Sequence, residues 1–181
     1  MLKRLAILLP LFLLLAFSPQ QDFKVSTGSI AFRSDASLEL IKAQSNELKG
    51  LFLADKKQFA FIVNIKSFKG FNSPLQQEHF NENYLETNKY PTASFEGKII
   101  EDVDVSKDGV YAVRAKGNLS IHGVVQERII KSELTVKDGN ISIKSNFTVL
   151  LADHNIPIPK VVHEKLASEI KVDIKADLIK K

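Results

Sequence analysis

The residues best suited to chemistry lie in one short stretch, EHFNENYLETNKYPTASFEGKI, at positions 78–99. His79 and Glu82 stand three residues apart, a spacing that puts two side chains on one helix face and that metal sites use. The chain has no cysteine, and no second histidine stands near this pair. We therefore favour a helix-packing or capping role for them, and we predict no metal and no cofactor.

The other histidines carry weaker signals. His122 lies in an Ile-His-Gly-Val sequence typical of a hairpin turn, where an imidazole bonds to turn backbone groups. His154 and His163 flank a proline-rich connection, and we expect both at the surface. His79 and His122 are the polar residues that we expect at a cavity mouth or a turn.

Enzyme signatures are otherwise missing from the sequence. It holds no Gly-x-Ser-x-Gly elbow and no glycine-rich phosphate loop. We therefore predict that the protein is not an enzyme, and we assign no catalytic residue. The alternative is a small-molecule enzyme in which His79 and His122, with Glu78 or Glu82, act on a bound small molecule.

The first 20 residues have the pattern of a secretory signal peptide. Lys3 and Arg4 precede an apolar run over residues 5–17, and a polar exit follows. Pro10 and the short run favour this interpretation over a membrane-spanning helix. We expect residues 1–20 to be removed, which leaves one domain at 21–181 in the periplasm or outside the cell.

Charge excludes one class of partner. The 181 residues carry 25 Lys and Arg against 21 Asp and Glu, a net charge of +4, and two of the basic residues lie in the predicted signal peptide. The remaining lysines are scattered singly, with no basic run that would follow a phosphate backbone. We predict no nucleic-acid partner and, because the outward positions are charged, no stable membrane insertion.

Hydrophobic periodicity predicts the elements that position these residues. Alternation of apolar and polar residues, typical of strands buried on one face, runs through residues 59–65, 111–121, 141–151 and 170–178. Weaker strands fit 22–33, 38–53, 93–104 and 124–137. Residues that tolerate positive φ, such as His122-Gly123 and Asp138-Gly139, separate neighbouring strands.

Long sequential strands of this kind predict an all-β fold. We expect an antiparallel up-and-down, lipocalin-like barrel of about eight strands, since closing the sheet buries its apolar face without a second layer. Two packed sheets are the alternative. The sequence leaves the oligomeric state open.

The interior is either filled with side chains or open to a ligand. Its predicted inward set mixes large phenylalanines with small Ala115, Gly117, Ser145 and Ala176. Small residues facing each other would leave an apolar cavity, whereas small opposite large would pack solid, and the strand register decides between them.

Residues 74–85 break the alternation between two strands. They place Leu75, Phe80 and Tyr84 near one side of a short helix, which we expect to cover one end of the barrel. Pro91 fixes its own φ and holds Tyr90 extended, so that the chain re-enters the sheet directly.

Two motifs resemble the YceI-like family. The first runs from His79 to Gly97 and contains a histidine, a following phenylalanine, a Tyr-Pro and a Phe-x-Gly strand; the second is Leu-Ser-Ile-His-Gly-Val at 119–124. The resemblance covers the predicted domain in strand order. It implies a secreted lipocalin-like barrel associated with polyisoprenoid or other long-chain lipid binding.

From the strands and this resemblance we expect an exported barrel that binds a long apolar ligand, lipid-like or isoprenoid-like, for carriage or sequestration. A filled barrel acting as an envelope stress or interaction protein is a further alternative. The predicted ligand-binding residues are Phe59, Phe61, Phe80, Tyr84, Phe95, Tyr111, Val113, Ala115, Gly117, Leu119, Phe147 and Ile174.

Overall fold

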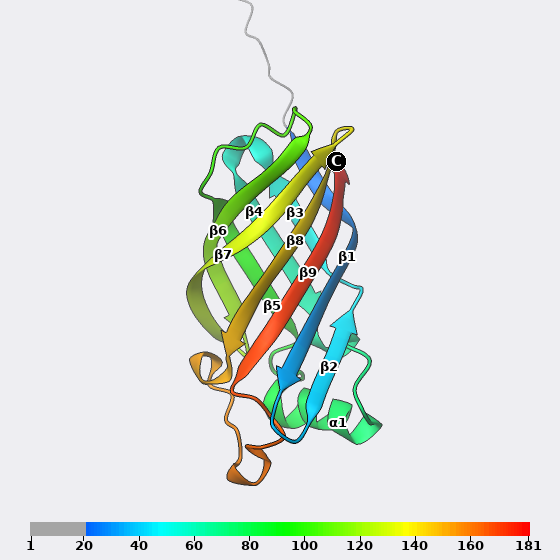
Figure 1. The fold of residues 1–181 in the computed structure, drawn as a ribbon, viewed down its shortest axis with the longest axis vertical. Helices are drawn as coiled ribbons and strands as arrows, with labels where there is room; N and C mark the ends of the chain where they lie inside the picture. The colour runs from blue at the N-terminus through cyan, green and yellow to red at the C-terminus, as the bar shows by residue number, and fades with distance from the viewer. Residues whose placement is uncertain (1–20) are drawn as a thin grey trace, which may run out of the picture.

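The computed structural model describes residues 21–181, so the predicted signal peptide at 1–20 lies outside the described residues. Nine antiparallel strands form one sheet (Figure 1). They are β1 Asp22–Asp35, β2 Leu40–Ser45, β3 Lys49–Leu53, β4 Gln58–Asn64, β5 Thr92–Ile99, β6 Gly109–Ile121, β7 Val124–Lys137, β8 Asn140–Leu150 and β9 Glu169–Lys180.

The sheet closes through its first and last strands. β1 pairs with β9 from Phe23 opposite Lys180 to Arg33 opposite Lys171. β2 and β3 both pair with the other edge of β1, one after the other, and so share one position in the barrel. The predicted up-and-down barrel of about eight strands is therefore confirmed, and the strand expected over 38–53 is divided in two.

Two hairpin turns fix the register of the longest strands. His122 and Gly123 have φ values of 51° and 72°, and Asp138 and Gly139 have values of 50° and 75°. Positive φ at both central residues gives a turn whose twist matches that of the strands. The two turns lie at opposite ends of the barrel, because β7 runs the full length between them.

The helical segments gather mainly at one end, called the helix end here. α1 spans Pro74–His79 and continues into a π-helix at Phe80–Tyr84, while short 3-10 turns lie at Ala54–Lys56, Ile65–Ser67, Leu151–His154 and Lys160–Val162. α1 lies beside β2 at the end opposite the C-terminus (Figure 1). The predicted short helix covering one end of the barrel is therefore present.

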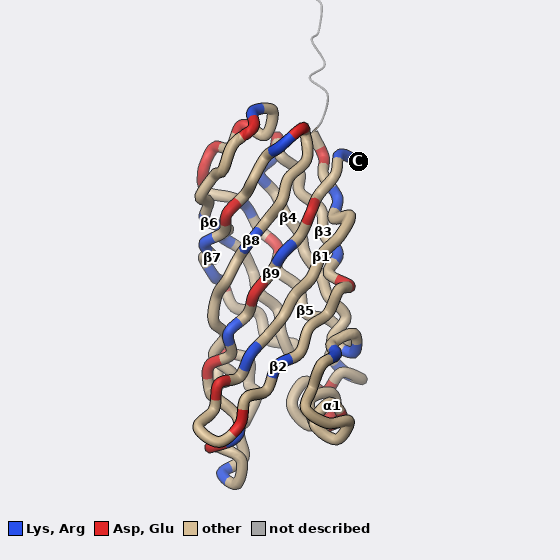
Figure 2. The backbone as a smooth tube through the Cα atoms, turned by 45° about the vertical axis from the view of Figure 1, so that its right-hand side comes forward, with Lys and Arg blue, Asp and Glu red and all other residues tan. Residues whose placement is uncertain are grey.

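The opposite end, called the filled end, contains the most deeply buried side chains. Phe23, Ile141 and Leu178 have no exposed surface, and Leu134 and Val136 are nearly as buried. Outside, basic and acidic residues alternate along the strands (Figure 2), with ion pairs such as Lys171–Asp35 at 2.9 Å. Within residues 21–181 no helix has the length and apolar character needed to span a bilayer.

Strand pairing is incomplete at the helix end. β7 and β8 pair only over Ser132–Lys137 and Asn140–Ser145, so their other halves separate. Arg128 and Gln126 donate side-chain hydrogen bonds across this gap to the Thr148 and Asp153 carbonyl oxygens, at 2.9 and 2.8 Å. Polar side chains thus replace part of the backbone ladder, and the interior widens there.

Candidate ligand-binding cavity

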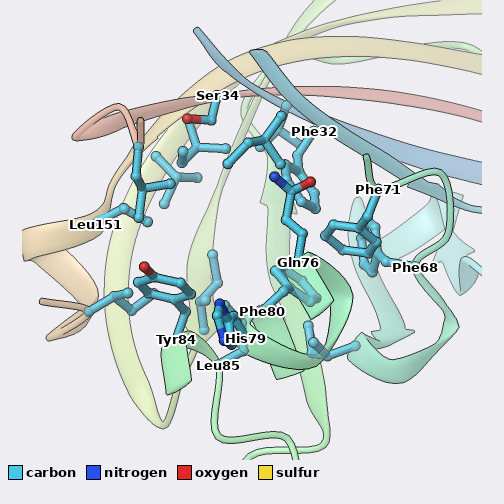
Figure 3. Close-up of a pocket in the computed structure, with 18 of the residues that line it drawn as sticks. Phe32, Ser34, Phe68, Phe71, Gln76, His79, Phe80, Tyr84, Leu85 and Leu151 are labelled. Carbon is cyan, nitrogen blue, oxygen red and sulfur yellow. The ribbon is translucent and has the colours of Figure 1, made fainter. Parts of the chain in front are cut away.

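A cavity of about 460 Å³ occupies the helix end (Figure 3). Its wall is mostly apolar and takes inward-facing residues from seven strands, among them Ile30, Val63, Val149 and Val172. Residues of the β4–β5 connection and of the β8–β9 connection complete the wall of the cavity. The volume lies within the ~300–1,000 Å³ range of small-molecule sites.

Local sequence explains why a helix forms over this opening. The Ser73 hydroxyl accepts a hydrogen bond from the Gln76 backbone N–H at 3.1 Å, and Pro74 occupies the first helical position. Both features are favoured at helix N-termini. After one and a half turns the helix widens into the π-helix, where the Leu85 N–H bonds to the Phe80 carbonyl at 3.0 Å. This widening points Phe80 and Tyr84 into the cavity.

An aromatic cluster holds the helical segment Pro74–Tyr84, called the cover here, on the barrel. The ring of Phe80 stacks on Phe32 of β1, with ring centroids 5.3 Å apart, and its centroid lies 5.0 Å from that of Phe71. The centroids of Phe32 and Phe68 are 5.5 Å apart. Each such pair contributes about 0.5–1.5 kcal/mol beyond its buried area. The Gln77 amide also donates to the Phe68 carbonyl at 3.0 Å.

Several polar groups in the cavity wall are already used internally. Ser34 is fully buried, and its hydroxyl accepts the Ala167 N–H at 2.9 Å. The Gln76 amide donates to the Glu39 carboxylate at 2.8 Å and accepts the Asn72 N–H at 3.0 Å. The Gln76 contacts tie the cover to the β1–β2 hairpin, and the Ser34 contact ties β1 to the β8–β9 connection, so we assign these groups to structure.

Three polar groups of the wall stay available to a ligand. Tyr84, His79 and Lys165 line the cavity, and none of their side chains hydrogen-bonds or pairs with another of the residues 21–181. His79 and Lys165 are exposed, which places them at the mouth, whereas burial raises the pKa of the Tyr84 hydroxyl. A ligand head group at this opening would meet hydrogen-bond donors.

His122 performs a different task. Its Nε2 lies 2.8 Å from the Glu86 carboxylate and its Nδ1 lies 3.0 Å from the His154 carbonyl oxygen. Both ring nitrogens of His122 are thus occupied by these two contacts. The Tyr90 ring packs against it with centroids 4.8 Å apart. His122 therefore joins the β6–β7 turn to two connections that frame the cavity.

His154 corrects a surface prediction. Its side chain is fully buried, with Nδ1 3.3 Å from the Val124 carbonyl oxygen, whereas His163 is exposed as expected. The Leu151–His154 turn folds inward against β7 and carries the histidine with it. Burial lowers the pKa of the His154 imidazole, because a buried site disfavours the charged form.

The predicted ligand-binding residues divide between the two ends. Phe80 and Tyr84 line the helix-end cavity, with His79 at its mouth. A second, much smaller void of about 60 Å³ lies deeper in the barrel and is lined by Phe59, Phe61, Phe95, Val113, Ala115, Phe147 and Ile174. Tyr111, Gly117 and Leu119 line neither space.

The register explains why the small inward residues leave so little room. Ala115 has Ile99 and Ile130 as its neighbours on the two adjacent strands, and Ala176 has Ile143, so each of these alanines has a large residue beside it in the sheet. Gly117 pairs with Gly97, and a Cβ on either one would overlap the backbone of the other strand. This glycine therefore permits a close approach of β5 and β6. Tyr111 donates to the Lys107 carbonyl at 2.9 Å in the β5–β6 loop.

Sequence reasoning missed much of the cavity wall. Phe32, Phe68 and Phe71 belong to the aromatic cluster, and Glu39 and Lys165 come from connections. The run of phenylalanines at 68, 71 and 80 in a segment without strand alternation was an available signal, because aromatic residues there need something to pack on. Nothing comparable marked the connection that holds Lys165.

His79 and His122 have different surroundings in the described part of the chain. Residues 21–181 contain no group of three His, Cys, Asp or Glu arranged to hold a metal ion. His79 lines the cavity, whereas His122 lies outside its wall and is bound to Glu86. The i, i+3 pair of His79 and Glu82 lies on exposed positions of the cover.

A closed antiparallel barrel with an apolar cavity beneath a helical cover defines a lipocalin-like barrel. The chain belongs to the YceI-like family, because a family model described as a YceI-like domain matches residues 17–178. The two motifs of that resemblance meet in space, where Tyr90 of the first packs on His122 of the second. No curated protein matches the chain.

Solved structures share the fold at low sequence identity. A polyisoprenoid binding domain from Saccharophagus degradans, described as implicated in plant cell wall breakdown, is 13% identical with a TM-score of 0.73 over 90% of this chain and 100% of that one. BcnA from Burkholderia cenocepacia is 11% identical with a TM-score of 0.69, covering 83% and 95% of the two chains. A YCEI protein from Campylobacter jejuni is 16% identical with a TM-score of 0.59, covering 78% and 85%.

Proposed function

We propose that this protein is exported and binds a lipid-like or isoprenoid-like ligand in the helix-end cavity, for carriage or sequestration. The observation that carries the proposal is the cavity of about 460 Å³, whose wall is apolar and whose free polar groups lie near the mouth. This arrangement suits an amphiphile with its tail inside and its head at the opening. The description of the Saccharophagus degradans domain as polyisoprenoid binding supports the same ligand class.

The contacts of the histidines favour binding over catalysis. His122 is occupied by Glu86 and by the His154 carbonyl, so it has no free nitrogen for a substrate. His79 at the mouth has no carboxylate or second imidazole bound to it among residues 21–181. A general base needs both reach to the substrate and a group that orients it.

The test of binding begins with protein purified from its native compartment. Organic extraction followed by mass spectrometry should release an amphiphile in near-stoichiometric amount. The delipidated protein should then bind the fluorescent apolar probe N-phenyl-1-naphthylamine, and the extracted amphiphile should displace it. Extracts without lipid, combined with no probe binding, would instead favour the filled barrel that acts through its surface.

Export is tested separately by intact mass. The processed protein should begin near residue 20 and should stay in solution without detergent. A species that still carries residues 5–17 would contradict removal of the signal peptide.

A further inference from the structure

The barrel interior is divided across its length. On three strands, the residue that lines the helix-end cavity is followed two positions deeper by a phenylalanine that does not line it. Val63 is followed by Phe61 on β4, Ala93 by Phe95 on β5, and Val149 by Phe147 on β8. Because inward positions recur every second residue in a strand, these rings stand directly behind the cavity.

These rings form a layer that separates the two spaces. Phe59, Phe61, Phe95 and Phe147 are called the phenylalanine layer here. The Phe59 ring lies 4.9 Å from Phe95 and 6.1 Å from Phe61, and Phe61 pairs directly with Phe95 across the strands. Behind them only about 60 Å³ is open. A hydrocarbon tail that enters from the helix end therefore meets aromatic rings halfway down the barrel.

The depth of the cavity follows from β1. This strand contributes wall residues from Ser34 near the helix end to Ile30, and Ile30 pairs with Ile174 at the level of the deeper void. Four residues of strand span about 13 Å at roughly 3.3 Å per residue. β1 as a whole has 14 residues, so the open space reaches along less than half of it.

Building on the proposed function, we infer that the ligand is a single-chain amphiphile whose tail ends against the phenylalanine layer. Those rings exclude a tail that would run the whole length of the barrel, so an isoprenoid-like ligand of this cavity would be a short one. The head lies at the mouth, where the exposed side chains of His79 and Lys165 and the half-buried Tyr84 hydroxyl make no hydrogen bond within residues 21–181. The chain thus selects ligands by tail length, and the layer sets the limit.

Displacement of N-phenyl-1-naphthylamine by saturated fatty acids from octanoate to eicosanoate tests this limit. Each added methylene should tighten binding about fourfold while the tail is still entering the cavity. Beyond a break in the series, further methylenes should add nothing or weaken binding. Phe95→Leu opens space in the layer and should move the break to longer acids, and Phe147→Leu provides an independent second variant.

Phe23→Leu is the matched control. It makes the same substitution at a fully buried ring of the filled end that lines neither the cavity nor the deeper void. The break should stay where it is in the unmodified protein. Circular dichroism and thermal unfolding show which variants are folded before their affinities are compared.

The outcomes separate the two proposals. Affinity that keeps rising through eicosanoate, or a break that does not move in folded Phe95→Leu and Phe147→Leu variants, would overturn the length limit while leaving lipid binding in place. A protein that binds neither the probe nor any acid, and whose native extract holds no lipid, would overturn the proposed function and this inference with it.

Discussion

The filled end and the helix end are built from the same strands but are packed for different tasks. At the filled end, β7 and β8 pair fully up to their turn, and Phe23, Ile141 and Leu178 have no exposed surface. At the helix end the same two strands separate, and a helix, an aromatic cluster and side-chain hydrogen bonds close the barrel instead. One end can stay hollow because the other supplies a dense core.

The difference also separates rigid from replaceable contacts. β7 and β8 are joined by a continuous backbone ladder at the filled end, whereas single side chains such as Arg128 and Gln126 bridge the gap between them at the helix end. Local opening is expected where buried apolar contacts are fewest. A ligand should therefore enter through the cover without disturbing the filled end. Mutations at the filled end should mainly lower stability, and mutations at the helix end should mainly weaken binding.

The largest effect is expected at the filled end. Leu178→Ala removes a fully buried side chain from β9 and should lower the free energy of unfolding by about 2–5 kcal/mol, since the cavity left behind cannot collapse. Leu166→Ala, in the partly buried cavity wall, should cost less than half as much. Urea unfolding of both variants measures the difference. Equal losses would show that the ends do not differ in packing.

Removing the cover's aromatic contact should act mainly on binding. Phe80→Ala deletes a ring that lines the cavity and stacks on Phe32, so probe affinity should fall about ten- to a hundredfold, equivalent to about 1.5–3 kcal/mol of apolar burial. Release of the probe in stopped-flow experiments should be faster. The Phe80→Ala variant should lose less free energy of unfolding than Leu178→Ala does.

His79→Ala is the control for this prediction, because His79 is adjacent, exposed and makes no side-chain hydrogen bond within residues 21–181. Probe affinity should change by less than about twofold, because N-phenyl-1-naphthylamine lacks the charged head group that His79 would contact at the mouth. If His79→Ala instead abolished a measurable turnover while Phe80→Ala left probe exchange unchanged, the carrier interpretation would be wrong.

The fold could be predicted almost completely from the sequence. Strict alternation in residues 111–121 defined β6, and the His122-Gly123 and Asp138-Gly139 pairs defined turns, because these signals are local. The division of β2 from β3 escaped prediction, since it depends on which part of β1 each one meets. Local patterns specify strands, whereas their partners depend on long-range register.

The location of the site was much less predictable. Inward residues at both ends show the same alternation, so Phe95 and Ala115 gave the same signal as residues near the cavity. Only the register shows that Ala115 is packed between isoleucines, and only the fold brings Lys165 to the mouth. His154 was misplaced because burial of its turn depends on contacts with β7, which no local pattern reveals.

The pH dependence of stability tests the helix end through His154. Burial lowers the pKa of this imidazole; hydrogen bonds to backbone carbonyls and nearby Asp153 oppose the shift, and Arg128 adds to it. The unfolded chain therefore takes up a proton at a higher pH than the folded protein does. The stability from neutral His154 is fully present above about pH 6.5 and is lost as the pH falls toward the folded-state pKa.

Urea unfolding between about pH 8 and 5 measures this loss. Carboxyl groups with lowered pKa values, such as Asp177, stay ionised over this range. His154→Gln should show a shallower fall in stability than the unmodified protein, whereas His163→Gln, at an exposed position, should show the same fall. Identical pH profiles for His154→Gln and the unmodified protein would contradict the assignment.

The smallest effect is expected from the cap of the cover. Ser73→Ala removes the hydroxyl that accepts the Gln76 N–H, a loss worth about 1 kcal/mol at helix N-termini. Because α1 has only six residues, this loss should destabilise the cover locally, and amide exchange across residues 76–85 should become about fivefold faster. Exchange at the filled end should not change, since the backbone ladder there is independent of the cover.

Ser168→Ala, at an exposed position whose hydroxyl makes no hydrogen bond within residues 21–181, should leave both regions unchanged. Faster exchange throughout the barrel in Ser73→Ala would show that cover and barrel open as one unit, which would remove the distinction between the two ends.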